Sequence, residues 1–305
     1  MEVAVHDSIE FHFDPDLLAD YLAGEGHDTR VVGDDDPLAG VDCVATFGHR
    51  EAFLETPWVH CIRAGVDEFP LERYRATDTA LTNSEGIHGE SVGETVLGYM
   101  LAFARLLHRY RDRQVEHRWE PGPYESAFTL AGERVCVVGL GTLGQGVATR
   151  ADALGMDVVG VRRRPRPAPG AREVVTSDEL LDAVADARFV VLCVPLAEST
   201  RGLVDGEVFA AMREDAYLVN VARGPVVDRA ALLEALNGDT IAGAALDAHH
   251  EEPLPRDSPL WDLENVLVTP HAAALVNRYH ELTGDLLLAN ADRYEAGDPL
   301  HDRVA

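Results

Sequence analysis

The chain of 305 residues contains no lysine, so all 26 of its basic residues are arginine. Aspartate and glutamate number 53, which gives a net charge of −27. This charge disfavours nucleic acids and anionic membrane surfaces as partners, because both would repel the protein. The acidic residues are scattered through a sequence that is 46% hydrophobic, so they indicate an acidic surface on a folded protein and not an acidic tail.

We interpret this acidic surface as that of an enzyme from a salt-loving organism. A dense acidic surface keeps such a protein dissolved. High salt then relieves the repulsion between like charges, because the Debye length falls to about 3 Å at 1 M. The alternative is ordinary acidic drift combined with codon usage that favours arginine.

Cysteine is scarce, and long apolar runs are absent. The four cysteines, Cys43, Cys61, Cys136 and Cys193, form no Cys-x-x-Cys motif and lie mostly in apolar segments, which is typical of core residues in a reducing compartment. No apolar run approaches the roughly 18 residues of a membrane span, and the N-terminus lacks a signal-peptide pattern. The sequence therefore favours a soluble cytoplasmic protein, and it predicts no metal site.

Residues 133–146, ERVCVVGLGTLGQG, read as a strand, a glycine turn and the start of a helix. Gly139, Gly141 and Gly144 have G-x-G-x-x-G spacing. The first glycine permits the tight turn, the second lets backbone approach a pyrophosphate, and the third lets the helix pack close to the strand. The helix N-terminus then points N–H groups at the phosphates. This context predicts a dinucleotide site, and the alternative is a glycine-rich turn in another α/β protein.

The next expected strand, Met156–Val161, ends in Arg162, Arg163 and Arg164. An NAD site places an acidic residue near here, about 20 residues after the glycine turn, to bind the ribose 2′-hydroxyl. The sequence has none, whereas guanidinium groups bind a 2′-phosphate through several charged hydrogen bonds. The run predicts NADP(H) as the preferred coenzyme, with NAD(H) possible. The alternative is a solvated basic loop.

Strand and helix signals alternate over residues 133–271, which predicts a doubly wound parallel sheet. Arg223, Asp247 and His271 each follow an expected strand, at the edge where such sheets bind ligands. No internal repeat interrupts this pattern.

Reduction of a 2-keto acid needs a cation for the carboxylate, a proton donor that titrates near neutrality, and a carboxylate that orients the donor. Arg223, His271 and Glu252 can fill these roles. A lone arginine or histidine is more often structural, and His88, His249 and His250 compete with His271 on chemistry alone.

Residues 1–90 read as a smaller parallel α/β unit. Arg63-Ala64-Gly65 follows a strand, where backbone N–H groups would be accessible to an anion, and a plain tight turn is the alternative. One helix is expected from about Ser91 to Arg113, linking domains or packing on a second subunit. Residues 119–128 read either as an extended arm that crosses to a partner chain or as a surface loop.

The ordered set of motifs resembles the D-isomer-specific 2-hydroxyacid dehydrogenase family. The similarity runs from about Val59 to the C-terminal helix, and the first 55 residues match in pattern only. The matching stretches are Val138–Gly144 (VGLGTLG), Leu218–Asp228 (LVNVARGPVVD), Ala244–Asp247 (AALD) with Glu251–Pro255 (EEPLP), and Val268–His271 (VTPH).

The resemblance implies two doubly wound parallel-sheet domains. A Rossmann cofactor domain, residues 92–273, would be inserted into a discontinuous flavodoxin-like substrate domain, residues 1–91 and 274–305. It also implies a homodimer formed through the long helix and the cofactor domain.

The same resemblance implies a set of site residues. Arg223 would bind the substrate carboxylate and keto oxygen, His271 would be the acid/base, and Glu252 would pair with it. Arg63, Ala64 and Gly65 would hold the substrate carboxylate, and Asp247 would contact the nicotinamide amide. The residues expected in the cofactor site are Gly139, Gly141, Thr142, Leu143, Gly144, Arg162, Arg163, Arg164, Val194, Pro195, Thr200, Val221, Ala222, Asp247 and Ala273.

Two features depart from the family pattern. The usual Asp-Val-Phe is Asp247-Ala248-His249 here, followed by His250, so this loop is more polar. The arginine run replaces the acidic residue, as in NADPH-using keto acid and glyoxylate/hydroxypyruvate reductases.

The expected activity is transfer of hydride from NAD(P)H to the keto carbon of a small 2-keto acid, giving a D-2-hydroxy acid. Two alternatives are a nucleotide-sensing scaffold like the C-terminal binding protein corepressors, and a methyltransferase that uses the glycine turn. The methyltransferase would need no Arg/Glu/His set.

Overall fold

The computed structural model describes residues 1–305, which form two compact units. Unit 1 comprises residues 1–87 and 275–305, and unit 2 comprises residues 88–274. The sequence placed the junctions after residues 91 and 273. None of the helices combines the length and the apolar character needed to cross a bilayer.

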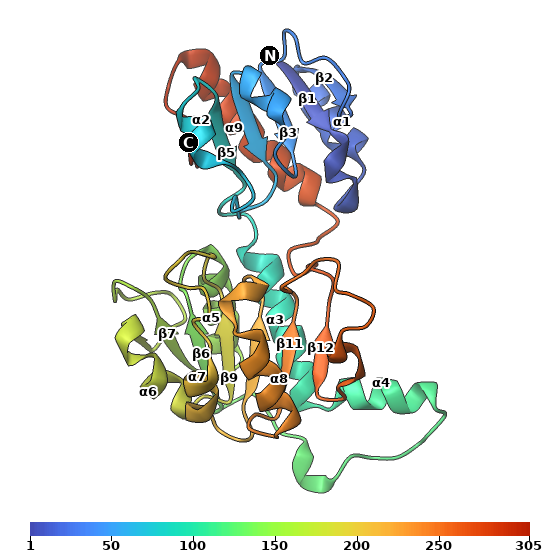
Figure 1. The fold of residues 1–305 in the computed structure, drawn as a ribbon, viewed down its shortest axis with the longest axis vertical. Helices are drawn as coiled ribbons and strands as arrows, with labels where there is room; N and C mark the ends of the chain where they lie inside the picture. The colour runs from blue at the N-terminus through green and yellow to red at the C-terminus, as the bar shows by residue number, and fades with distance from the viewer. The chain divides into compact units, whose positions relative to one another are not determined.

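Unit 1 is built on a five-stranded parallel sheet in the order β2-β1-β3-β4-β5. Its strands are β1 (Glu2–His6), β2 (Asp28–Val32), β3 (Cys43–Thr46), β4 (Trp58–Cys61) and β5 (Ala80–Asn83). Helices α1 (Pro15–Gly24) and α9 (Tyr279–Ala296), from opposite ends of the chain, pack together on one face (Figure 1). Helix α2 (Leu71–Arg75) lies on the other face. This strand order is the flavodoxin-like one that the sequence predicted.

Unit 2 contains a seven-stranded parallel sheet in the order β12-β11-β10-β9-β6-β7-β8, the Rossmann arrangement with one added strand. Its strands are β6 (Arg134–Val138), β7 (Asp157–Val161), β8 (Glu173–Val175), β9 (Phe189–Leu192), β10 (Tyr217–Asn220), β11 (Gly243–Leu246) and β12 (Val266–Val268). Its helices are α3 (Gly89–Ala104), α4 (Leu107–Val115), α5 (Thr142–Ala153), α6 (Leu180–Ala185), α7 (Gly206–Ala211) and α8 (Arg229–Asn237). Short 3₁₀ turns are η1 (Asp7–Phe11) and η2 (Glu51–Glu55) in unit 1, and η3 (Tyr124–Ser126), η4 (Ser177–Glu179), η5 (Gly224–Val226) and η6 (Pro259–Asp262) in unit 2.

Both faces of the larger sheet are buried. Successive strand residues point to opposite faces, so Cys136 and Val138 join the core under α6, α7 and α8. Val135 and Val137 join the core under α3 and α5. This double burial explains why the strands read as continuous apolar runs. All four cysteines are buried and unpaired, as the sequence predicted.

The prediction of a single helix from Ser91 to Arg113 is wrong. Helix α3 ends at Ala104, and Leu106 adopts a left-handed backbone with φ of 57° before α4 begins. The apolar face of α3 is buried on unit 2, whereas α4 buries no residue. Helix α4 and the loop that follows it extend away from the rest of unit 2 (Figure 1). Residues 108–114 (HRYRDRQ) are polar or charged except for Tyr110, so α4 has no apolar face like that of α3.

Two short features complete unit 2. The edge strand β8 was not predicted from the sequence. Thr176 follows this strand and forms a reciprocal capping box with Glu179.

Glycines let α3 and α5 approach until their backbones touch. A Cβ on Gly93 would lie 2.6 Å from the carbonyl oxygen of Gly146, and a Cβ on Gly89 would lie 2.9 Å from that of Thr142. Because α5 begins at the glycine turn, this contact supports the helix whose N-terminus faces the predicted dinucleotide site. Gly98, on the same helix α3, has no atom within 4 Å of its Cβ position.

We therefore expect Gly93→Ala to destabilise unit 2 by about 1–3 kcal/mol, because the added methyl group meets backbone atoms that cannot move aside. Gly98→Ala is the matched control, and it should stabilise the helix by about 0.5–1 kcal/mol, because alanine has the higher helix propensity. Urea unfolding followed by circular dichroism measures both. Equal effects of the two substitutions would contradict the close packing of α3 on α5.

Candidate active site

The glycine turn between β6 and α5 is closed by contacts that exclude side chains. Gly139 has φ of 96°, and a Cβ there would lie 2.6 Å from the Cys193 carbonyl oxygen. Gly144 packs directly on the carbonyl of Gly139. Gly141 precedes the first residues of α5, Thr142 and Leu143, whose N–H groups lie at the helix N-terminus. This arrangement fits a bound pyrophosphate.

A cavity of about 820 Å³ opens beside this turn. The predicted residues that line it are Gly139, Gly141, Arg162, Arg163, Arg164, Val194, Pro195 and Thr200. Thr200 closes a tight loop by donating a hydrogen bond of 2.6 Å from Oγ1 to the Pro195 carbonyl oxygen. The cavity lies at the carboxyl ends of β6, β7 and β9, where the strand order reverses and such folds bind nucleotides.

The cavity wall is cationic. Arg162, Arg163 and Arg164 are joined there by Arg166, and no acidic residue lines the cavity. Sequence reasoning missed Arg166 and also Ser177, another lining residue. Arg166 belongs to the same arginine-rich run and could have been included. Ser177 follows β8, so its place became visible only with that strand.

The remaining cofactor predictions lie outside this cavity. Val221 and Ala222 follow β10 and are buried. Asp247 and Ala273 are also buried, in the loops after β11 and β12. A contact of these residues with a coenzyme stays a prediction.

Glu252 and His271 come together as expected. Glu252 Oε2 lies 2.8 Å from His271 Nδ1, and Glu252 Oε1 accepts a hydrogen bond of 2.8 Å from the backbone N–H of His249. Burial alone would raise the pKa of Glu252, but the hydrogen bonds from His271 and His249 and the imidazole charges outweigh it and lower that pKa. The ionised carboxylate therefore holds the proton on Nδ1, which leaves Nε2 for acid–base chemistry.

The loop that carries His271 is held by a buried carboxylate. Asp247, only 2% exposed, accepts hydrogen bonds from Thr269 Oγ1 at 2.6 Å and from the backbone N–H groups of Ala272 and Ala273 at 2.9 Å. The Tyr99 hydroxyl lies 2.7 Å from Thr269 Oγ1. His271 itself has φ of 53°, an uncommon backbone conformation that these contacts help to maintain.

Arg223 follows β10, next to the strand that precedes Asp247. Asn220 fixes its turn: the side-chain amide donates to the Arg223 carbonyl oxygen and accepts from the Ala222 N–H, both at 3.0 Å. The guanidinium donates to the Ala222 carbonyl oxygen at 2.8 Å. The next residue, Gly224, packs on the His249–His250 peptide, so the loops after β10 and β11 are in contact.

The other candidate proton donors, His249, His250 and His88, lie in surroundings different from those of His271. The rings of His249 and His250 bond the carbonyl oxygens of Thr269 and Val227, at 3.0 and 2.9 Å. Burial lowers the pKa of His88 to about 4, which keeps it neutral at physiological pH. His271, paired with a carboxylate and 34% exposed, is the histidine best suited to proton transfer.

In unit 1, the predicted anion-binding turn is ordered by its own contacts. The Arg63 guanidinium donates to Glu68 Oε2 at 2.7 Å and lies 3.9 Å from the centre of the Phe47 ring. Asn83 donates to the Ala64 carbonyl oxygen at 2.6 Å, and Gly65 follows directly in the chain. Because Glu68 already binds the guanidinium, recognition of a substrate carboxylate by Arg63-Ala64-Gly65 stays a prediction.

The family model described as D-isomer specific 2-hydroxyacid dehydrogenase, NAD binding domain, matches residues 97–273. The chain belongs to this family. It is 30% identical to an uncharacterized protein of Corynebacterium melassecola over 93% of each chain. It is 33% identical to a glyoxylate/hydroxypyruvate reductase B of Yersinia pestis, over 69% of this chain and 65% of the relative. It is also 33% identical to a D-3-phosphoglycerate dehydrogenase of Methanocaldococcus jannaschii, over 77% of this chain and 44% of the relative. The chain thus spans less than two thirds of these two relatives.

Solved structures of the family share the whole architecture. A D-isomer specific 2-hydroxyacid dehydrogenase from Xanthobacter autotrophicus, in complex with NADPH and MES, superposes with a TM-score of 0.86 at 30% identity, covering 100% of this chain and 98% of that one. An NADPH-dependent glyoxylate/hydroxypyruvate reductase from Sinorhizobium meliloti, in complex with NADP and sulfate, superposes at 0.83 with 27% identity, covering 99% and 98%. The predicted fold and family are confirmed.

The arginine wall predicts discrimination between the two dinucleotides. Arg162→Asp combined with Arg163→Asp should weaken NADPH binding by at least about 10-fold and change NADH binding far less, because the lost charge-assisted hydrogen bonds serve only the 2′-phosphate. Titration calorimetry with both dinucleotides measures this difference.

The control replaces Arg111 and Arg303, two exposed arginines outside the cavity, with aspartate and makes the same change in net charge. It should leave the ratio of the two dissociation constants unchanged. A wild-type protein that binds NADH tenfold more tightly than NADPH would show that the arginines serve another purpose.

Proposed function

We propose that the protein is an NADP(H)-preferring 2-ketoacid reductase. It transfers hydride to the keto carbon of a small 2-keto acid and forms a D-2-hydroxy acid, in a reversible reaction. The observation that carries this proposal is the hydrogen bond between Glu252 and His271 at the carboxyl edge of a dinucleotide-binding sheet.

Each residue has a definite task in the reduction. The reduced nicotinamide, when bound, supplies the hydride. As the keto carbon accepts it, charge develops on the keto oxygen, and His271 donates the Nε2 proton to that oxygen. Glu252 keeps the imidazolium oriented and balances its charge. Arg223 binds the substrate carboxylate and polarises the keto oxygen. In the reverse direction, His271 takes the hydroxyl proton.

Coenzyme and substrate classes follow from the site and from the relatives. The four arginines on the cavity wall, without an acidic residue beside them, favour NADP(H), and NAD(H) stays possible. Relatives named as glyoxylate/hydroxypyruvate reductases make small 2-keto acids the first candidates. The named relatives are enzymes, so nothing supports the corepressor-like scaffold or the methyltransferase.

The proposal also includes the oligomeric state and the cellular location of the protein. Trp119 and Tyr124, on the loop after α4, are 101% and 98% exposed, and α4 also exposes Leu107 and Val115. Such an apolar surface favours a homodimer in which this segment packs on a second copy. Four reduced cysteines and a small-metabolite substrate favour a cytoplasmic location.

A substrate panel tests the reaction. NADPH oxidation should occur with at least one of glyoxylate, hydroxypyruvate, pyruvate, 2-ketobutyrate and 2-ketocaproate, and chiral chromatography should identify the D-product. His271→Ala should lower kcat by about 10²- to 10⁴-fold, because the proton donor is lost. His301→Ala, an exposed histidine of unit 1, is the control and should keep the wild-type rate. An undiminished rate in His271→Ala would reject the assignment.

The acidic composition predicts salt-dependent stability. The melting temperature should rise as potassium chloride increases from 0.1 to about 3 M, because screening relieves repulsion within a chain of charge −27. Differential scanning calorimetry at several salt concentrations measures this. A melting temperature that stays constant or falls with salt would favour acidic drift over adaptation to salt.

A further inference from the structure

The loop after β11 contains two adjacent histidines, His249 and His250, that the reaction itself does not use. His249 is 8% exposed, and its ring is oriented by one specific contact. Ring atom Nε2 lies 3.0 Å from the carbonyl oxygen of Thr269. A carbonyl oxygen only accepts hydrogen bonds, so His249 carries a proton on Nε2 and donates it.

The same residue also contacts the catalytic carboxylate. The backbone N–H of His249 donates to Glu252 Oε1 at 2.8 Å, while Glu252 Oε2 bonds His271. Thr269, whose carbonyl accepts from the His249 ring, lies two residues before His271. His249 therefore joins both partners of the catalytic pair: the carboxylate through its backbone, and the loop of the imidazole through its ring.

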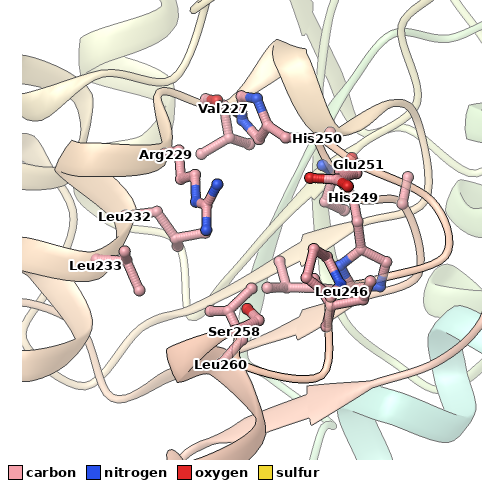
Figure 2. Close-up of a pocket in the computed structure, with 15 residues that line it drawn as sticks. Val227, Arg229, Leu232, Leu233, Leu246, His249, His250, Glu251, Ser258 and Leu260 are labelled. Atoms are coloured by element: carbon pink, nitrogen blue, oxygen red, sulfur yellow. Dashed lines mark hydrogen bonds between the residues drawn. The ribbon is translucent and has the colours of Figure 1, made fainter.

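His250 secures the other side of this loop. Its Nε2 donates to the Val227 carbonyl oxygen at 2.9 Å, and Figure 2 shows the two residues side by side. Val227 lies in the segment after Arg223, and Gly224 of that segment packs on the His249–His250 peptide. The two histidines thus bind the loop after β11 to the loops on both neighbouring strands.

We propose that His249 is a positioning residue, which sets the orientation of the Glu252–His271 pair through its bond to the Thr269 carbonyl oxygen. This inference rests on the proposed role of His271 in proton transfer. Asp247 bonds the side chain of Thr269 and the N–H groups of Ala272 and Ala273, but no contact of Asp247 reaches the Thr269 carbonyl. The ring of His249 supplies that contact, so the loop is held at a second point by the residue whose backbone N–H binds Glu252.

The expected consequence concerns rate more than substrate binding. A small displacement of the imidazole misaligns the proton donor, and a misplacement of about 1 Å can cost about 100-fold in rate. A looser pair also stabilises the imidazolium less well, so the reductase would lose its proton donor at lower pH. Binding of the keto acid carboxylate, which depends on Arg223, should change little.

The test compares two side chains of similar size at position 249. His249→Leu removes the donor, and His249→Gln places an amide N–H where Nε2 stood. His249→Leu should lower kcat by at least about 10-fold with KM for the keto acid within about threefold, and should shift the alkaline midpoint of the pH–rate profile downward. His249→Gln should restore most of the lost kcat and return the alkaline midpoint of the pH–rate profile close to its wild-type value. His108→Leu is the control, because the His108 ring makes an equivalent 3.0 Å bond to the Ala102 carbonyl oxygen away from the site.

The outcomes separate the two proposals. If wild type reduces no 2-keto acid, the proposed function fails. If wild type is active and His271→Ala is not, but His249→Leu keeps the wild-type kcat and pH–rate profile, the positioning role fails alone. Equal losses in the leucine and glutamine variants would also overturn it, because the hydrogen-bond donor would then be irrelevant.

One measurement needs no variant and covers the case in which His249→Leu does not fold. Nitrogen-15 NMR of histidine-labelled wild type should show His249 protonated on Nε2 near pH 7.5, as donation to Thr269 requires. The Nδ1–H tautomer of neutral His249 would exclude the bond and with it the positioning role.

Discussion

The parallel pairing of β10, β11 and β12 is the constraint on which the candidate site depends. Leu246 pairs with Asn220 on one side and with Val268 on the other, so the three strands end together at one edge of the sheet. Arg223, Asp247 and His271 leave the sheet at this edge. Because the strands are parallel, each crossover connection returns the chain in the same direction, so residues far apart in sequence reach the same edge of the sheet.

Proximity at a sheet edge does not by itself orient side chains, and buried polar contacts supply the orientation. The Asp247 carboxylate is almost fully buried, yet it is surrounded by donors from the loop after β12, so its charge is compensated. The Glu252 carboxylate is shared between His249 and His271. Each strand-end loop is thus held by a neighbour, and the imidazole of His271 is the last member of a chain of contacts.

Two groups of arginine side chains differ in their surroundings, those paired with acidic residues and those that line the large cavity. In a chain with net charge −27, many arginines pair with acidic residues, as Arg134 does with Asp157 and Asp186. The wall of the large cavity is different, because Arg162, Arg163, Arg164 and Arg166 gather there with no acidic residue lining it. A local excess of positive charge on a strongly acidic protein favours binding of an anion, and its position beside the glycine turn is consistent with the phosphate of a dinucleotide.

By itself, the sequence determined the features that depend on local pattern. Glycine spacing, continuous apolar strands and the arginine run predicted a dinucleotide-binding parallel sheet, and the motif order predicted the family. The pairing of Glu252 with His271 was also predicted, although only through the resemblance.

Only the tertiary structure decided what depends on a partner distant in sequence. The break occurs at Leu106, which is buried with a left-handed backbone, and the polar residues after Leu107 fit a continuous helix as well as a broken one. Ser177 reaches the cavity through an edge strand too short to recognise in sequence. Asp247 and His249 hold the His271 loop across two strands, and no local spacing encodes such a contact. Periodicity reports which face of an element is apolar, but hydrogen bonds between loops exist only once the sheet has brought those loops together.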